Sequence, residues 1–178
     1  MADNDVFAVW LVPNKYHAEL LRRVIAELSR NHDTEAFTPH VTLFTGQENS
    51  TDVLRSRLIK LAGSLGEKEL KIPVAGYKHS NDFFKTYYLN MEKPDALDAL
   101  AKRARALADL PSDYTFKPHL SLIYKEMDAR KRRKLEDEVE DPPAEICCDR
   151  LFLVKPGNAE AGWRDVAAWR VLDMRNLN

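Results

Sequence analysis

The chain has 178 residues, with 27 Lys and Arg against 28 Asp and Glu, so its formal net charge is −1. This balance excludes binding of nucleic acid through a global positive field, and 44% hydrophobic residues indicate a globular chain with one core. No apolar segment is long enough to span a bilayer, no signal-peptide pattern is present, and adjacent Cys147 and Cys148 make no disulfide framework. We expect a cytoplasmic monomer without membrane contact and without a strong nucleic-acid surface.

The first half of the chain predicts alternating strands and helices. A continuous apolar run ended by Pro13 predicts a buried strand, and Asn14 suits the cap of the helix that follows. The expected strands cover 6–12, 38–45 and 70–77, and the expected helices run from Asn14 to about Asn31 and onward from a cap at Thr51 or Asp52.

The second half predicts the same order. The expected elements are a strand over 83–91, a helix opened by Pro94, a strand after Pro118, a charged helix over about 128–140, and strands over 146–154 and 166–173. We therefore predict a single domain over 1–178 made of two pseudo-repeat halves, 1–78 and 83–178. A pseudo-twofold axis between the halves would bring their middle strands side by side.

Two matching motifs stand in those middle strands. Pro39 to Phe44 and Pro118 to Tyr124 each contain His, an apolar residue, Thr or Ser, and Leu. Because alternate side chains of a strand share a face, His40 and Thr42 point one way, as do His119 and Ser121. The pairing of the two strands predicts a small space with two imidazoles and two hydroxyls.

Such a space suits hydrolysis of a phosphodiester. An imidazole with a pKa of about 6.5 serves as base or acid near neutral pH, and hydroxyls donate hydrogen bonds to phosphoryl oxygens. The two histidines have no carboxylate or cysteine at ligand spacing, so we expect no metal and no other cofactor. The basic run from Arg130 to Lys134 is followed directly by acidic residues, which favours a solvated helix face.

On these residues the chain resembles the 2H phosphoesterases, named for two His-x-Thr/Ser motifs. It is most similar to the plant and fungal cyclic phosphodiesterases, because Phe83-Phe84-Lys85 precedes a strand and Tyr124 follows the second motif. The resemblance implies an α+β, bilobal fold, with two pseudo-symmetric antiparallel sheets lining a central cleft and helices outside. It implies metal-independent opening of ADP-ribose 1'',2''-cyclic phosphate, a by-product of tRNA splicing, or of nucleoside 2',3'-cyclic phosphates to 2'-phosphates.

The resemblance also implies roles for single residues. His119 becomes the base and His40 the acid, although the residues themselves leave the reverse assignment open. Thr42 and Ser121 bind the phosphate. Tyr124 joins them only if the strand bends or bulges after Ile123, because its offset from His119 is odd. We expect an aromatic wall for a base-like ring among Tyr77, Phe83 and Phe84.

Two other functions fit the same motifs. One is processing of longer RNA ends by a 2H phosphoesterase, against which the near-neutral charge counts. The other is a non-catalytic module that binds a nucleotide, although both histidines and both hydroxyls are present. The physiological substrate is not determined by these residues.

Overall fold

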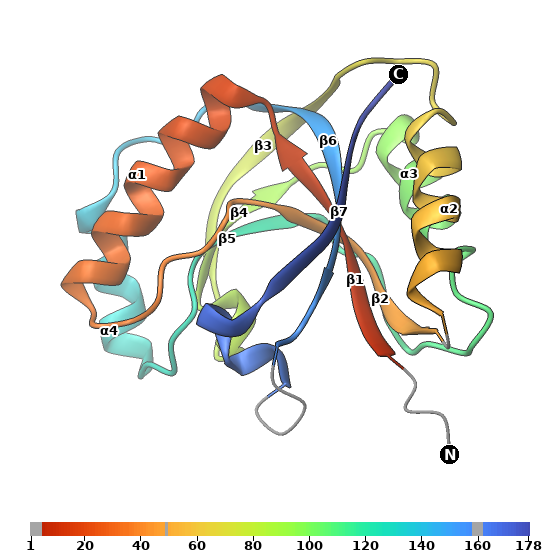
Figure 1. The fold of residues 1–178 in the computed structure, drawn as a ribbon. Coiled ribbons are helices and arrows are strands. Elements are labelled where there is room, and N and C mark those ends of the chain that lie inside the picture. The colour runs from red at the N-terminus through yellow and green to blue at the C-terminus, as the bar shows by residue number, and fades with distance from the viewer. Residues whose placement is uncertain (1–4, 49, 158–161) are drawn as a thin grey trace.

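The computed structural model describes residues 5–48, 50–157 and 162–178. Antiparallel strands form one sheet with helices on its outer side (Figure 1). The strands are β1 (Asp5–Pro13), β2 (Val41–Glu48), β3 (Leu70–His79), β4 (Tyr87–Met91), β5 (His119–Ile123), β6 (Glu145–Lys155) and β7 (Arg170–Asn176). The α-helices are α1 (Lys15–Asn31), α2 (Thr51–Ala62), α3 (Asp95–Arg105) and α4 (Ala129–Lys134). In the described ranges, none of them has the length and apolar character needed to cross a membrane.

The strand order reads β2-β1-β6-β3-β4-β5, with β7 also paired to β6. In each half of the chain the second strand forms an edge, the first strand lies next to it, and the third lies in the centre, so the halves mirror one another about the β6–β3 pair. The third strand of each half is exchanged: β3 pairs with β4, and β6 pairs with β1. The α+β class and the antiparallel arrangement are confirmed. The two sheets that we expected are the two ends of one continuous hydrogen-bonded sheet.

The two motif strands, which we expected to lie side by side, are not hydrogen-bonded neighbours. β2 and β5 lie at opposite ends of the strand order, yet they contact each other. The first helix of each half also packs on the motif strand of the other half: α1 packs on β5, and α3 packs on β2. In Figure 1, α1 and α4 lie to the left of the strands and α2 and α3 to the right. The curvature of the sheet therefore brings the motif strands together.

Strand β1 is buried on both faces, which explains its unbroken apolar sequence. Phe7, Val9 and Leu11 belong to the main core, whereas Ala8 and Trp10 belong to a second, smaller cluster. That smaller cluster also contacts Trp163 and Trp169 from the C-terminal segment. The second face of β1 is therefore the face that looks toward the space between the motif strands.

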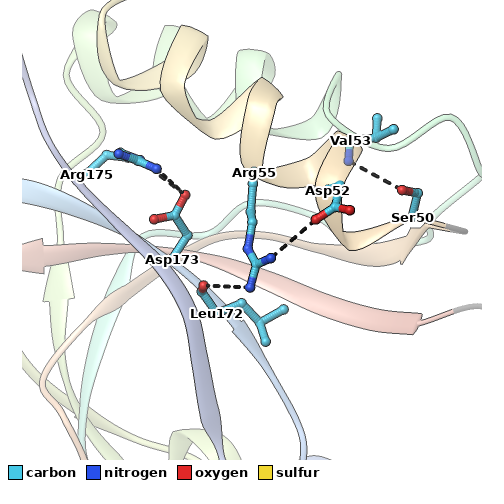
Figure 2. A network of polar contacts seen from close by, with 7 residues as sticks. All are labelled: Ser50, Asp52, Val53, Arg55, Leu172, Asp173 and Arg175. Carbon is cyan, nitrogen blue, oxygen red and sulfur yellow. Dashed lines mark hydrogen bonds and ion pairs between the residues drawn. The ribbon is translucent and has the colours of Figure 1, made fainter.

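Helix α2 ties the C-terminal strand to the first half of the chain (Figure 2). Its cap is Ser50, whose hydroxyl accepts from the Val53 amide, in place of the expected Thr51 or Asp52. Arg55 on this helix donates to the Leu172 carbonyl of β7 at 3.3 Å and pairs with Asp52. This contact joins α2 to β7, which is itself paired with β6.

Several boundaries differ from the predicted ones. Phe83 and Phe84 belong to a 3-10 turn, η1 (Phe83–Lys85), and the strand begins only at Tyr87. The turn forms because the Asp82 carboxylate accepts from the Phe84 amide at 2.8 Å. The charged helix is α-helical only over α4 and continues as a 3-10 helix, η2 (Leu135–Glu138). The last strand begins at Arg170, after two 3-10 turns, η3 (Gly162–Arg164) and η4 (Val166–Ala168).

Candidate active site

A cavity of about 340 Å³ lies between the two motif strands. It receives side chains from β1, β2, η1, β5 and the C-terminal segment. Six of the predicted site residues line it, namely His40, Thr42, Phe84, His119, Ser121 and Tyr124. Eight others complete the lining, namely Ala8, Trp10, Thr45, Asp82, Lys85, Tyr114, Trp163 and Trp169. The structure therefore brings both imidazoles and both motif hydroxyls to one space.

The two histidines are held in the same way. The Nδ1–H of His40 donates to the Thr38 carbonyl at 2.7 Å, and that of His119 donates to the Lys117 carbonyl at 2.7 Å. A carbonyl only accepts, so Nδ1 carries the hydrogen in both rings. In the neutral rings, each Nε2 is left with its lone pair available for proton transfer.

Burial favours the neutral form of both rings. It lowers the pKa of His40 to about 3 and that of His119 to about 4, against a smaller opposing effect of the carbonyl hydrogen bonds. A positive charge on His119 would lower the pKa of His40 further. The two rings are therefore close enough to interact, and a proton on one disfavours a proton on the other.

The surroundings of the two rings differ. The His40 imidazole lies flat on the Trp10 indole, with ring centroids 3.7 Å apart and planes 10° apart, and Trp169 meets it edge-on. Among the described residues, Tyr88 is the aromatic ring at the edge of His119, with ring centroids 5.6 Å apart, and His119 lies within electrostatic range of Lys85 and Asp82. One end of the cavity is thus aromatic, and the other carries charged groups.

The two motif hydroxyls are also unequal. The buried Ser121 hydroxyl donates to the Phe84 carbonyl at 2.6 Å, which fixes η1 against β5. Thr42 is half-buried, and within the described ranges its hydroxyl makes no hydrogen bond to protein. Of the two motif hydroxyls, that of Thr42 therefore offers its hydrogen to a ligand without rearrangement.

A β-bulge in each motif strand explains how further residues reach the cavity. In the β1–β2 pair, Val9 faces Phe44 and Trp10 faces Thr42, so Leu43 of β2 has no partner on β1. In the β4–β5 pair, Tyr87 faces Ile123 and Tyr88 faces Ser121, so Leu122 of β5 has no partner on β4. The extra residue reverses the alternation of side chains. Consistently, Leu43 and Phe44 are both in the core, as are Leu122 and Ile123.

The bulges turn Tyr124 and Thr45 toward the ligand space. Both residues stand five positions after their motif histidine, so they are counterparts in the two halves. The bulge that turns Tyr124 lies at Leu122, before the expected place after Ile123, and the Tyr124 ring stacks on Phe37 with the centroids 3.9 Å apart. Burial raises the pKa of its phenol, which therefore stays protonated. Thr45 was not predicted, and its sequence signal is this shared offset.

The predicted aromatic wall is partly wrong. Tyr77 lies in a different cavity, where its hydroxyl donates to the Glu140 carbonyl at 2.8 Å and its ring stacks on Tyr87. Phe83 packs against the core and carries the Arg164 guanidinium on its ring, at 4.7 Å from the centroid. Only Phe84 lines the cavity, because a 3-10 turn, unlike a strand, rotates neighbouring side chains by about a third of a turn.

The aromatic lining instead comes from tryptophans. Trp10 supports His40, and Trp163 and Trp169 close the same side of the cavity. The Trp169 indole N–H donates to the Trp163 carbonyl at 2.9 Å, which fixes the pair. In the sequence these tryptophans lie far from either motif, and no local pattern links them to it.

The cavity residues do not form a metal centre of the usual kind. Over the part of the chain that the structure describes, no three His, Cys, Asp or Glu side chains are grouped so as to hold a metal ion. Cys147 and Cys148 are buried free thiols in β6, away from the cavity. Proton transfer by imidazole is the chemistry that this site offers.

Known structures share this fold. Escherichia coli LigT without ligand is 16% identical, with a TM-score of 0.65 over 98% of each chain, and LigT is also solved with 3'-AMP and with phosphate. The protein TT0787 of Thermus thermophilus is 16% identical with a TM-score of 0.56 over 97% of each chain. Kluyveromyces marxianus Usb1 is 10% identical with a TM-score of 0.52 over 98% of each chain.

Sequence comparison identifies the family. A search of curated proteins found no significant match. The model of the family described as "Cyclic phosphodiesterase-like protein" matches residues 6–177, which includes both histidine motifs and the C-terminal tryptophans. With this match over nearly its whole length, the chain belongs to the cyclic phosphodiesterase-like family, within the 2H phosphoesterase superfamily.

Proposed function

We propose that this hydrolase of phosphodiesters opens the cyclic phosphodiester of small nucleotides without a metal ion. The proposed reactions convert nucleoside 2',3'-cyclic phosphates to 2'-phosphates and ADP-ribose 1'',2''-cyclic phosphate to ADP-ribose 1''-phosphate. The observation that carries the proposal is the shared cavity, into which two imidazoles of the same fixed tautomer are brought. Its volume of about 340 Å³ suits a small ligand better than a polymer.

The reaction needs one proton taken and one given. Nε2 of His119 accepts a proton from water while the water oxygen bonds to phosphorus. The bond from phosphorus to the 3'-oxygen breaks, and protonated His40 donates its Nε2 proton to that oxygen. The product is the 2'-phosphate, and the two histidines have exchanged their protonation states.

This assignment depends on the charge that the substrate brings, because in the free protein burial lowers the pKa of His40 to about 3, below the value of about 4 for His119. Burial keeps His119 neutral and able to act as base, and the positive charge of Lys85 adds to this against a smaller effect of Asp82. The indole face beneath His40 favours an imidazolium there, and so does the negative charge of a bound phosphodiester. His40 is therefore proposed to gain its proton when the substrate binds.

The remaining lining residues suit a nucleotide. The free Thr42 hydroxyl is placed beside His40 on the same strand face and can donate to a phosphoryl oxygen. Tyr124 and the pair Trp163 and Trp169 offer flat apolar surface for a base. LigT, which has a similar fold, is solved with 3'-AMP, and this supports a nucleotide as the ligand. The proposed active form is a monomer.

The test is hydrolysis of adenosine 2',3'-cyclic phosphate in excess chelator, with the product identified by phosphorus NMR. His40→Ala and His119→Ala should each lower kcat by about 10²- to 10⁴-fold. His79→Ala is the matched control, because His79 ends β3 and does not line the cavity. Full activity of either motif variant would overturn the proposal.

A comparison of substrates separates the alternatives. An oligonucleotide ending in a 2',3'-cyclic phosphate that reacts much faster than the mononucleotide would favour processing of RNA ends. Binding of adenosine 2'-monophosphate with no turnover of any cyclic phosphate would favour a non-catalytic module. We also propose a cytoplasmic location, which is supported by two free thiols that suit a reducing compartment.

A further inference from the structure

Lys85 brings a positive charge to the cavity that the two-histidine reaction does not use. It is the last residue of η1 and lines the cavity together with His119 and Ser121. The charge lies close enough to His119 to lower the pKa of that imidazole. Lys85 therefore stands beside the group proposed to activate water.

The backbone that carries Lys85 is firmly held. The Lys85 carbonyl accepts from the hydroxyl and the amide of Ser80, at 2.8 and 3.1 Å. The preceding carbonyl, of Phe84, accepts from the Ser121 hydroxyl of the second motif. The backbone at Lys85 is thus joined to β5 through the adjacent Phe84 carbonyl.

The Lys85 ammonium has no ion-pair partner in the described ranges of the chain. The acidic residue nearest in sequence, Asp82, uses its carboxylate to cap η1 through the Phe84 amide. Lys85 is half-buried, and burial lowers its pKa more than the charge of Asp82 raises it. A partly desolvated cation without a partner costs free energy of folding, so its presence at the cavity indicates an anionic ligand.

We infer that the Lys85 ammonium contacts the reacting phosphoryl group and stabilises the negative charge that grows on its oxygens in the transition state. The inference rests on the proposed function. It is favoured by the state of Ser121, whose hydroxyl donates to the Phe84 carbonyl and so does not offer its hydrogen to a ligand without rearrangement. Lys85 remains protonated throughout, and the bonds formed and broken are those of the two-histidine reaction.

The test uses adenosine 2',3'-cyclic phosphate, because its single phosphate is the reacting one. Lys85→Met should lower kcat by about 10- to 100-fold, the effect of one charged hydrogen bond, with a smaller change in KM. The effect falls on kcat because the charge on the phosphoryl oxygens increases from substrate to transition state. Lys85→Arg, which keeps the charge, should recover most of the lost rate. Lys60→Met, on the exposed face of α2, is the matched control and should behave as the wild type.

A binding measurement keeps the inference testable even if no cyclic phosphate is hydrolysed. Lys85→Met should weaken binding of adenosine 2'-monophosphate by about tenfold in calorimetry, which is the lower end of the range expected for losing one charged hydrogen bond. The Tm of Lys85→Met should equal or exceed that of the wild type. Unchanged kcat and binding would overturn the inference. It would equally fail if Lys85→Arg lost as much rate as Lys85→Met, or if the loss appeared only with substrates that carry a second phosphate. Absence of turnover by the wild type would instead count against the proposed function.

Discussion

The imidazole of His40 lies flat against the indole of Trp10, with the ring centroids 3.7 Å apart. The contact depends on the pairing of β1 with β2, which sets Trp10 opposite Thr42. It gives one of two otherwise equivalent histidines an electron-rich support. The other histidine has a tyrosine edge and a lysine in its place. A symmetric pair of motifs thereby acquires two different chemical environments.

Replacing Trp10 should lower kcat, whereas replacing a core residue of the same strand should lower Tm. Trp10→Leu removes the stacking surface, worth about 0.5–1.5 kcal/mol for a ring pair, so kcat should fall by about 3- to 10-fold. Trp10→Phe should lose less, because a ring remains. Phe7→Leu is the control, since Phe7 lies on the same strand but in the main core, away from the cavity. It should lower Tm and leave kcat near the wild-type value; equal kcat for all three variants would contradict the role of Trp10.

The tautomers of both histidines are open to direct observation. At pH 7 each ring should be neutral, with the hydrogen on Nδ1, because Nδ1 donates to a backbone carbonyl. Long-range nitrogen-proton NMR spectra of labelled protein should show two rings of this kind, titrating with pKa values of about 3 for His40 and about 4 for His119. A ring protonated on Nε2, or one that titrates near its usual value of about 6.5, would show that the burial described here is absent in solution.

The same burial predicts how stability depends on pH. The folded pKa values of about 3 and about 4 lie below the ordinary value of 6.5, so the unfolded chain binds protons first as the pH falls. The contribution of these rings to stability is complete above about pH 6.5 and is lost as the pH falls through the window down to about 4 and 3.

Denaturant titrations at about pH 7.5 and about pH 5, on either side of the unfolded histidine pKa, measure this loss. The variant His40→Gln with His119→Gln should lose less stability than the wild type between these pH values. His17→Gln, outside the catalytic cavity, serves as the comparison. If the double variant and the wild type lost equal stability, other groups would be responsible for the acid sensitivity.

The two motif hydroxyls should respond differently to removal. Thr42→Val removes a free donor of the cavity and should lower kcat by about 10²-fold with little change in Tm. Ser121→Ala leaves the Phe84 carbonyl without its donor, so it should lower stability by about 1–3 kcal/mol as well as slow the reaction. Kinetics and thermal melts on the two variants test this asymmetry. Matching effects in both assays would mean that the Ser121 bond is not maintained in solution.

Local sequence was enough to predict the elements and the two motifs. Apolar spacing predicted the strands and helices in their observed order, and the His-x-Thr/Ser pattern identified four of the cavity residues. It failed where a turn replaced a regular strand. Phe83 and Phe84 read as the start of a strand, but the Asp82 cap makes a 3-10 turn and sends Phe83 to the core.

By itself, then, the sequence determined the repeated strand and helix order and the face on which each imidazole stands beside a hydroxyl, because these follow from spacing along one segment. Only the tertiary structure decided which strands meet, that Leu43 and Leu122 bulge, and that Tyr77 lies apart from the cavity. It alone placed Trp10 under His40 and Lys85 beside His119. Such neighbours depend on the register between strands far apart in the chain, and that register is set by the packing of the whole core.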